Sequence, residues 1–248
     1  QKERALYAHT RPRSAIGEAL RSIRTNVLFR VGNKHPKTLL MTSSVPQEGK
    51  SFLSSNLAAI MAMPGTRVLL IDADLRRPSV HRIFDMANET GFSDVLLGKM
   101  QMSEVVRQTH VPNLDIVTAG AIPPSPTELL ESDIMRNIHS QIHGYDVIFF
   151  DSPPVTLVTD PIVISLLVDG VIFVVESGST RKPIVQSAIN RLQQVNARVL
   201  GGIVNRLEIK RDGYGYYYGG YYYTTYGGYY SEEEYELQKE AQLAGKTI

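Results

Sequence analysis

Short apolar runs alternate with helical patterns through the middle of the chain. Each run carries almost only apolar side chains and is bounded by turn residues. Because the runs are continuous and not alternating, they are typical of strands that are covered on both faces. Between most of them, apolar residues recur at helical spacing. The expected strands are 38–41, 68–71, 114–117, 147–150, 171–175 and 199–204, and the expected helices are 51–63, 127–142 and 183–195.

This alternation predicts an α/β fold, a mostly parallel sheet with helices on both faces. A chain of 248 residues has room for one such domain with appendages. It contains no cysteine, which excludes disulfide scaffolds, thiolate metal sites and cysteine nucleophiles. Its formal net charge of +1 gives no basic footprint, so we expect no nucleic-acid partner. No apolar run approaches the roughly 20 residues of a membrane-spanning helix.

The two ends of the chain differ from its middle. Residues 14–30 have apolar side chains at helical spacing, which predicts an amphipathic helix with Ser14 as its cap. Eleven of the thirteen tyrosines lie between 214 and 235 among many glycines, which predicts a flexible tail. The chain starts at Gln1 and not at methionine, so we expect a piece of a longer protein. The predicted parts are an N-terminal segment (1–37), a core (38–210) and a tail (211–248).

A loop that can bind phosphate follows the first expected strand. Residues 44–51 read Ser-Val-Pro-Gln-Glu-Gly-Lys-Ser, the Walker A spacing with Ser44 in place of the first glycine. Such a loop turns its backbone N–H groups, and the positive end of the following helix, toward an anion. Lys50 can reach the β- and γ-phosphates of ATP, and the Ser51 hydroxyl can ligate Mg²⁺. The alternative is an ordinary strand–loop–helix junction. The residues expected to contact the nucleotide here are Ser44, Gln47, Glu48, Gly49, Lys50, Ser51 and Phe52.

Carboxylates follow two further expected strands. Asp72 and Asp74 come after 68–71, and Asp151 comes after 147–150. Ligands of such sheets bind at the carboxyl ends of the strands, so we expect these groups around the phosphates. Asp151 is expected to hold Mg²⁺ through a water. On an extended backbone Asp72 and Asp74 would share a face, one binding the metal and the other accepting a proton from an incoming hydroxyl. The alternative is that they are caps or turn residues.

Four motifs, and their order along the chain, resemble the cytoplasmic catalytic domain of the bacterial tyrosine kinases. These kinases accompany capsule and exopolysaccharide export. The most specific is a hydrophobic triplet followed by Asp-x-Asp-x-Arg, at 69–76. Asp-x-x-Pro lies at 151–154, and the tyrosine cluster lies at 214–230. Glu-x-x-Arg-x-x-Arg, the family's ring-assembly motif, is matched by Glu18, Arg21 and Arg24.

The resemblance implies a protein-tyrosine kinase with ATP and Mg²⁺ as cofactors. Catalysis would fall to Asp72, Asp74 and Lys50, and metal binding to Ser51, Asp72 and Asp151. It further implies a homo-oligomeric ring in which a tail enters the neighbour's active site, at the cytoplasmic face of the bacterial inner membrane. A membrane-embedded activator, or a transmembrane portion of the same chain, is an expected partner. The tyrosines expected to be phosphorylated are Tyr214, Tyr216, Tyr217, Tyr218, Tyr221, Tyr222, Tyr223, Tyr226, Tyr229 and Tyr230.

Two further residues each have two possible roles. Asn205 ends the last expected strand, where related ATPases contact adenine, although a strand-end Asn is more often a turn residue. Asp160 precedes a short apolar segment and is interpreted as a helix cap, with a role behind the active site as the alternative.

Other functions are compatible with a P-loop. Partitioning and cell-division-site ATPases have a similar fold but carry a signature lysine at the position of Val45, so the sequence disfavours them. A module that holds ATP only to assemble is a third possibility. The tyrosine tract by itself is more typical of a low-complexity linker that binds partners by stacking than of a kinase substrate.

Overall fold

The computed structural model describes Leu6, Tyr7 and residues 14–207. Apart from Leu207, these residues belong to one compact unit that ends at Arg206. The predicted tail and its tyrosines lie outside the described residues.

A seven-stranded sheet runs through the described unit in the order β3-β4-β2-β5-β1-β6-β7. All neighbouring strands pair in parallel except β3 and β4, which are antiparallel. The prediction of a mostly parallel α/β sheet is therefore confirmed. The strands are β1 (Lys37–Ser43), β2 (Val68–Asp72), β3 (Arg107–Gln108), β4 (Leu114–Val117), β5 (Val147–Asp151), β6 (Gly170–Glu176) and β7 (Val199–Asn205).

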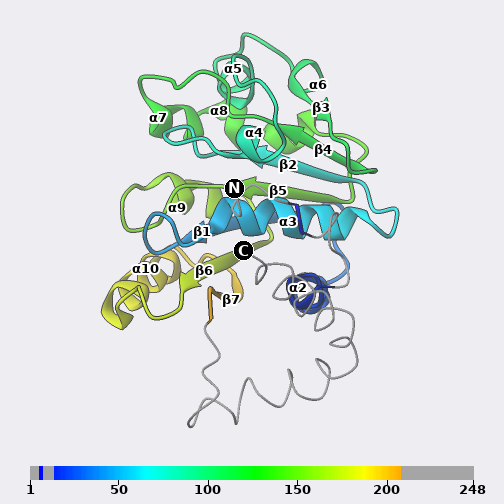
Figure 1. Ribbon diagram of the computed structural model, residues 1–248. Coiled ribbons are helices and arrows are strands. Elements are labelled where there is room, and N and C mark those ends of the chain that lie inside the picture. Colours follow the sequence, from blue (N-terminus) through cyan, green and yellow to red (C-terminus); the bar gives the residue numbers. More distant parts are fainter. Residues whose placement is uncertain (1–5, 8–13, 208–248) are drawn as a thin grey trace, which may run out of the picture. The chain divides into compact units, whose positions relative to one another are not determined.

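Helices cover both faces of this sheet (Figure 1). On one face α3 (Lys50–Ala62) contacts β1, β2 and β5, and α2 (Ala15–Val31) packs against α3 and β7. A hydrophobic core lies on each face of the sheet, and successive strand residues point alternately into one and the other. Leu39 therefore packs with α3, while Leu40 packs with the opposite layer. Every residue of β2 and β5 is buried, which explains their continuous apolar sequences.

The opposite layer consists mainly of short helices. They bury apolar side chains such as Phe92, Leu130, Ile164 and Leu192 against the sheet. None of the described helices is long and apolar enough to cross a membrane. Between residues 14 and 207 the other helices are α4 (Val80–Ile83), α5 (Phe92–Leu96), α6 (Met102–Val105), α7 (Pro126–Leu130), α8 (Asp133–Arg136), the 3-10 helix η2 (Ile138–Gln141), α9 (Asp160–Ser165) and α10 (Lys182–Gln194).

The N-terminal helix forms as its sequence predicts. The Ser14 hydroxyl accepts a hydrogen bond from Gly17 N at 3.2 Å, and Gly32 ends the helix with a positive φ of 83°. Leu20, Val27 and Val31 are buried against the core, so the apolar stripe fixes α2 on the domain.

The predicted helix over 127–142 is wrong. The segment divides into α7, α8 and η2. Ser132 starts a new helix because its hydroxyl accepts a hydrogen bond from Met135 N at 3.2 Å, and Asn137 leaves helical geometry with φ −100° and ψ 13°. Apolar spacing alone therefore overestimated the length of this helix.

Candidate active site

The loop between β1 and α3 has a backbone that only particular residues tolerate. Gln47 and Gly49 both adopt positive φ, 68° and 90°. A side chain on Gly49 would collide with the Asn205 amide, which donates a hydrogen bond to the Glu48 carbonyl at 2.9 Å. Glycine at 49 is therefore required both by its φ and by this close approach.

The Glu48 side chain stabilises the loop from within the protein. It is 1% exposed. Its carboxylate accepts hydrogen bonds from Val45 N at 2.9 Å, Glu176 N at 3.2 Å and the Thr180 hydroxyl at 2.5 Å. Since its oxygens are already bonded to protein donors, only the backbone of Glu48 is left for a phosphate.

Two other predicted nucleotide contacts have side chains that pack against the protein, Ser44 buried and Phe52 half-buried. Phe52 packs edge-on against Tyr7, with ring centroids 5.9 Å apart. Ser44 is buried and its hydroxyl has no partner among the described residues, while its carbonyl accepts a hydrogen bond from the Thr156 hydroxyl at 2.5 Å. Any contact of these residues with a phosphate would therefore come through backbone N–H groups.

Lys50 lies among the three predicted carboxylates. Its Nζ is 3.0 Å from Asp74 Oδ2, 3.9 Å from Asp151 Oδ2 and 3.2 Å from the Ser51 hydroxyl. The parallel pairing of β2 with β5 sets Asp72 directly beside Asp151. All three carboxylates are buried, so one lysine lies opposite three acidic groups at the carboxyl edge of the sheet.

Asp72 and Asp74 differ in their partners. Asp72 accepts hydrogen bonds from Asp74 N at 3.2 Å, Ser79 N at 2.9 Å and Val80 N at 3.0 Å. Asp74 accepts one from Arg77 N at 2.9 Å and turns its other oxygen to Lys50. The expectation that both share a strand face fails because β2 ends at Asp72. Asp72 instead stabilises the loop that carries Asp74.

Burial and the interactions between the charged groups shift the pKa values of this cluster. Burial, and after it the repulsion of the Asp151 carboxylate, raise the pKa of Asp72 to about 7, against the lowering effect of the Val80 N–H and Lys50. Burial also raises the pKa of Asp151, although Lys50 opposes it. For Lys50 burial lowers the pKa, but the attraction of Asp151, Asp74 and Asp72 outweighs it and the pKa is raised. The cluster therefore favours an additional cation.

Asp151 meets the requirement for a magnesium ligand. Both of its carboxylate oxygens are buried and lack a hydrogen bond from any described residue. The hydroxyls of Ser51 and Ser54 lie near enough to lower its pKa, but without ordinary hydrogen-bond geometry. A buried carboxylate without donors is costly unless a cation neutralises it. These residues therefore fit a magnesium ion.

The cluster does not form a closed metal cage. The described part of the chain contains no group of three acidic or histidine side chains arranged around one metal position. Mg²⁺ commonly keeps several waters and takes only one or two carboxylates together with substrate phosphates. Ser51, Asp72 and Asp151 are thus the residues that would hold an ion arriving with the nucleotide.

The interpretation of Asp160 as a helix cap is wrong. Thr159 occupies the cap position of α9, and the Asp160 side chain is fully buried. Its carboxylate accepts a hydrogen bond from Arg76 Nε at 2.8 Å. No local pattern in the sequence indicates this pairing, because its partners are 84 residues apart.

The motif on α2 expected to mediate ring assembly has partners within its own chain. Glu18 and Arg21 form an exposed ion pair on the helix. Arg24 donates a hydrogen bond to the Ile60 carbonyl of α3 at 3.2 Å. A contact of these residues with a second copy stays a prediction.

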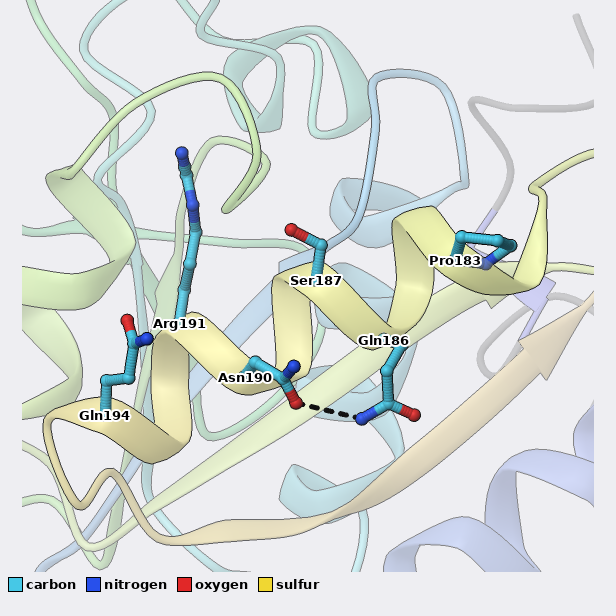
Figure 2. A pocket seen from close by; sticks show the side chains of 6 residues that line it. All are labelled: Pro183, Gln186, Ser187, Asn190, Arg191 and Gln194. Atoms are coloured by element: carbon cyan, nitrogen blue, oxygen red, sulfur yellow. Dashed lines mark hydrogen bonds between the residues drawn. The ribbon is translucent and has the colours of Figure 1, made fainter.

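A surface hollow on α10 is lined by other residues. A groove of about 480 Å³ runs along α10 and is lined only by residues of that helix (Figure 2). Figure 2 also shows the hydrogen bond of 2.9 Å between Gln186 and Asn190. None of the predicted site residues lines this groove. The acidic cluster at the P-loop is therefore the better candidate for chemistry.

Comparison with known proteins decides the family. A family model described as an AAA domain matches residues 47–203. The putative tyrosine-protein kinase CapB of Staphylococcus aureus is 38% identical over 214 residues, which cover 86% of this chain and 94% of that protein. Tyrosine-protein kinase YwqD of Bacillus subtilis is 39% identical over 217 residues, 87% of this chain and 92% of YwqD. The chain belongs to the bacterial tyrosine kinases.

Solved structures agree with this membership. The kinase domain of the Escherichia coli tyrosine kinase ETK has a TM-score of 0.80 and 33% identity, covering 87% of this bacterial tyrosine kinase and 85% of that domain. The septum site-determining protein MinD of Pyrococcus horikoshii, with a TM-score of 0.59 and 22% identity, shares the fold alone.

Proposed function

We propose that this chain is a Mg·ATP-dependent protein-tyrosine kinase that phosphorylates the tyrosine cluster at 214–230 on a neighbouring copy. The observation that carries the proposal is the buried cluster of Lys50, Asp74 and Asp151 beside a P-loop. Family membership supports tyrosine as the acceptor, because CapB, YwqD and ETK are all named tyrosine kinases.

Positioning and charge stabilisation supply most of the rate in phosphoryl transfer. The backbone N–H groups of the loop and Lys50 would hold the β- and γ-phosphates, and Mg²⁺ would neutralise the charge that develops there. For this, Lys50 must turn from Asp74 toward the phosphates, which frees an oxygen of Asp74. Asp72 has both oxygens bonded to backbone donors. We therefore assign the base to Asp74.

The proton and the phosphoryl group would then be transferred in a single step. The tyrosine hydroxyl gives its proton to Asp74 while its oxygen bonds to the γ-phosphorus. The bond from that phosphorus to the β–γ bridging oxygen would break, and ADP would leave. Asn205 stays the proposed adenine contact. It lies beside the loop, where its amide donates to the Glu48 carbonyl.

The proposed setting follows from the family. The chain would form a ring of its own copies through α2 and act in capsule or exopolysaccharide synthesis at the cytoplasmic face of the inner membrane. A membrane activator, separate or part of the same protein, would complete it. The chain is also similar in fold to a solved protein titled the chimerical protein CapA2B2, with a TM-score of 0.78 and 33% identity over 82% of this chain and 90% of that one.

Intact mass after incubation with Mg·ATP tests the activity. Mass increments of one phosphate each, mapped to the tail tyrosines, support a kinase. Release of ADP without mass increments would support an ATPase, and no turnover would support an assembly module. The variants Lys50→Met and Asp74→Asn serve as matched controls, because each removes one partner of the same ion pair and should abolish the increments.

A further inference from the structure

Arg76 is the part of the Asp-x-Asp-x-Arg motif that neither phosphate nor metal binding uses. Its guanidinium binds the Asp160 carboxylate with two hydrogen bonds, Nε to Oδ2 at 2.8 Å and Nη2 to Oδ1 at 3.1 Å. A paired contact of this kind fixes the orientation of both groups as well as their distance. Arg76 is therefore held in one defined position.

Thr127 closes the contact into a network. Its hydroxyl donates to Asp160 Oδ1 at 2.8 Å and accepts from Arg76 Nη2 at 2.8 Å. Asp160 is fully buried, whereas the Arg76 side chain is 37% exposed. We call Arg76, Thr127 and Asp160 the Asp160 network.

The network joins the segments that follow three neighbouring strands. Arg76 lies in the loop after β2, Asp160 begins α9 after β5, and Thr127 lies in α7 after β4. These strands are adjacent in the sheet, in the order β4-β2-β5. Asp72 and Asp151 are the last residues of β2 and β5, so the segments after these two strands start directly at the acidic cluster. The network therefore ties together the two loops on which the acidic cluster depends.

A direct path leads from the network to Asp74. The backbone N–H of Arg77, the residue after Arg76, donates to Asp74 Oδ1 at 2.9 Å. The other oxygen of Asp74 lies 3.0 Å from Lys50 Nζ. Displacing Arg76 would move the Arg77 amide, and with it the carboxylate that faces the lysine.

We propose that Asp160 is a positioning residue for phosphoryl transfer: through Arg76 it holds the 73–77 loop so that Asp74 meets the incoming tyrosine hydroxyl. The inference rests on the proposed kinase function. Asp160 itself touches neither nucleotide nor acceptor. The P-loop is held by other contacts, those of Glu48 and Asn205, so the network acts on the turnover step and leaves nucleotide affinity in place.

The test compares turnover with ADP affinity in the full chain. In Asp160→Asn and Arg76→Lys, kcat for tail phosphorylation should fall about 10- to 100-fold, since a misplacement of about 1 Å costs a factor of that order. The Kd for Mg·ADP should stay within about threefold, because the loop that binds phosphate is unchanged. Equal losses in kcat and ADP affinity would overturn the proposal, since they indicate general loosening of the site.

Matched variants separate positioning from folding. Thr127→Ser keeps the hydroxyl and should keep kcat, while Thr127→Val keeps the shape and should lower it. Removing one partner of a buried ion pair destabilises a protein, whereas replacing both by apolar residues often does not. Arg76→Met/Asp160→Leu should therefore fold, bind Mg·ADP and turn over slowly.

A folded double variant with wild-type kcat would contradict the positioning role of Asp160, while the proposed kinase function would still hold. If the wild-type chain itself forms no phosphotyrosine, the proposed function falls instead.

Discussion

At the scale of the residue, Asp72 links the charge of the active site to stability. Its carboxylate is buried and has a pKa raised to about 7 from the ordinary 3.8, first because of burial and then because of Asp151. Between these two pH values the folded protein keeps a proton that the unfolded chain has released. The stabilisation from Asp72 is therefore complete below the lower value and is lost as the pH rises through about 7.

We predict that this loss is visible as a pH-dependent difference between the wild type and Asp72→Asn. Each pKa unit corresponds to about 1.4 kcal/mol, so the wild type should lose a few kcal/mol relative to the variant between about pH 4 and 7. Above that range the difference should be constant. Urea unfolding of the nucleotide-free proteins at stepped pH measures it. A difference independent of pH would mean that Asp72 titrates in its ordinary range.

The sequence predicted which residue types gather at the site, but not every partner. Motif spacing identified Lys50, Asp74 and Asp151, because short loops after neighbouring parallel strands must meet at one edge of the sheet. It missed the contacts of Glu48 with Thr180 and of Asp160 with Arg76, which are 132 and 84 residues apart in the chain. Such pairings depend on how whole elements pack, and no local pattern encodes them.

At the scale of the element, Glu48 connects the P-loop to β6 and to the segment before α10. Hydrogen bonds to a charged group contribute about 1.5–3 kcal/mol each, and Glu48 accepts three of them. We predict that Glu48→Gln lowers the free energy of unfolding by about 2 kcal/mol and weakens Mg·ADP binding about tenfold, because the amide cannot serve every donor. Thermal unfolding and calorimetric titration measure the two effects.

Thr180→Val is the control for this element link. It removes one of the three contacts and leaves the carboxylate in place, so both effects should be smaller. Unchanged ADP affinity in Glu48→Gln would show that the loop keeps its shape without the carboxylate.

The charged residues of α2 are expected to mediate assembly and not folding. Its Glu18–Arg21 ion pair is exposed and contributes only about 0.3–0.5 kcal/mol, so replacing it should hardly affect folding. We predict that Glu18→Ala/Arg21→Ala/Arg24→Ala sediments as a monomer and phosphorylates its tail weakly. Arg24→Ala alone is the control, because Arg24 also bonds to the Ile60 carbonyl of its own chain. A triple variant that sediments like the wild type would place the assembly contact on another surface.

Helices and strands could be predicted from the sequence where their burial produces a recognisable pattern of apolar residues. The continuous apolar runs mark strands, and each of the six expected strands is present. The expectation of cover on both faces is wrong for the edge strand β7, in which only Leu200 is buried. The two-residue β3 and the helices of four to six residues are too short for a period to show. In 127–142 the apolar spacing continues through Ser132, but its hydroxyl caps a new helix and interrupts the old one.

At the scale of the whole molecule, net charge determines what repeated phosphorylation does. The chain carries a formal charge of +1, and ten tyrosines of the tail cluster lie just before Glu232, Glu233 and Glu234. Each phosphotyrosine adds about −1.5 to −2 charges near neutral pH, so five of them would bring the chain to roughly −7 to −9. Neighbouring tails in an assembly would then repel one another and these glutamates.

We predict that extensive tail phosphorylation releases the tail from the neighbouring site and loosens the assembly. Sedimentation velocity before and after incubation with Mg·ATP measures this, and phosphatase treatment should restore the larger species. A variant with the cluster tyrosines changed to phenylalanine should keep its assembly throughout. Because salt shortens the Debye length from about 10 Å at 0.1 M to about 3 Å at 1 M, high salt should oppose the dissociation of the phosphorylated protein. Phosphorylated chains that stay fully assembled at low salt would rule out charge repulsion as the release mechanism.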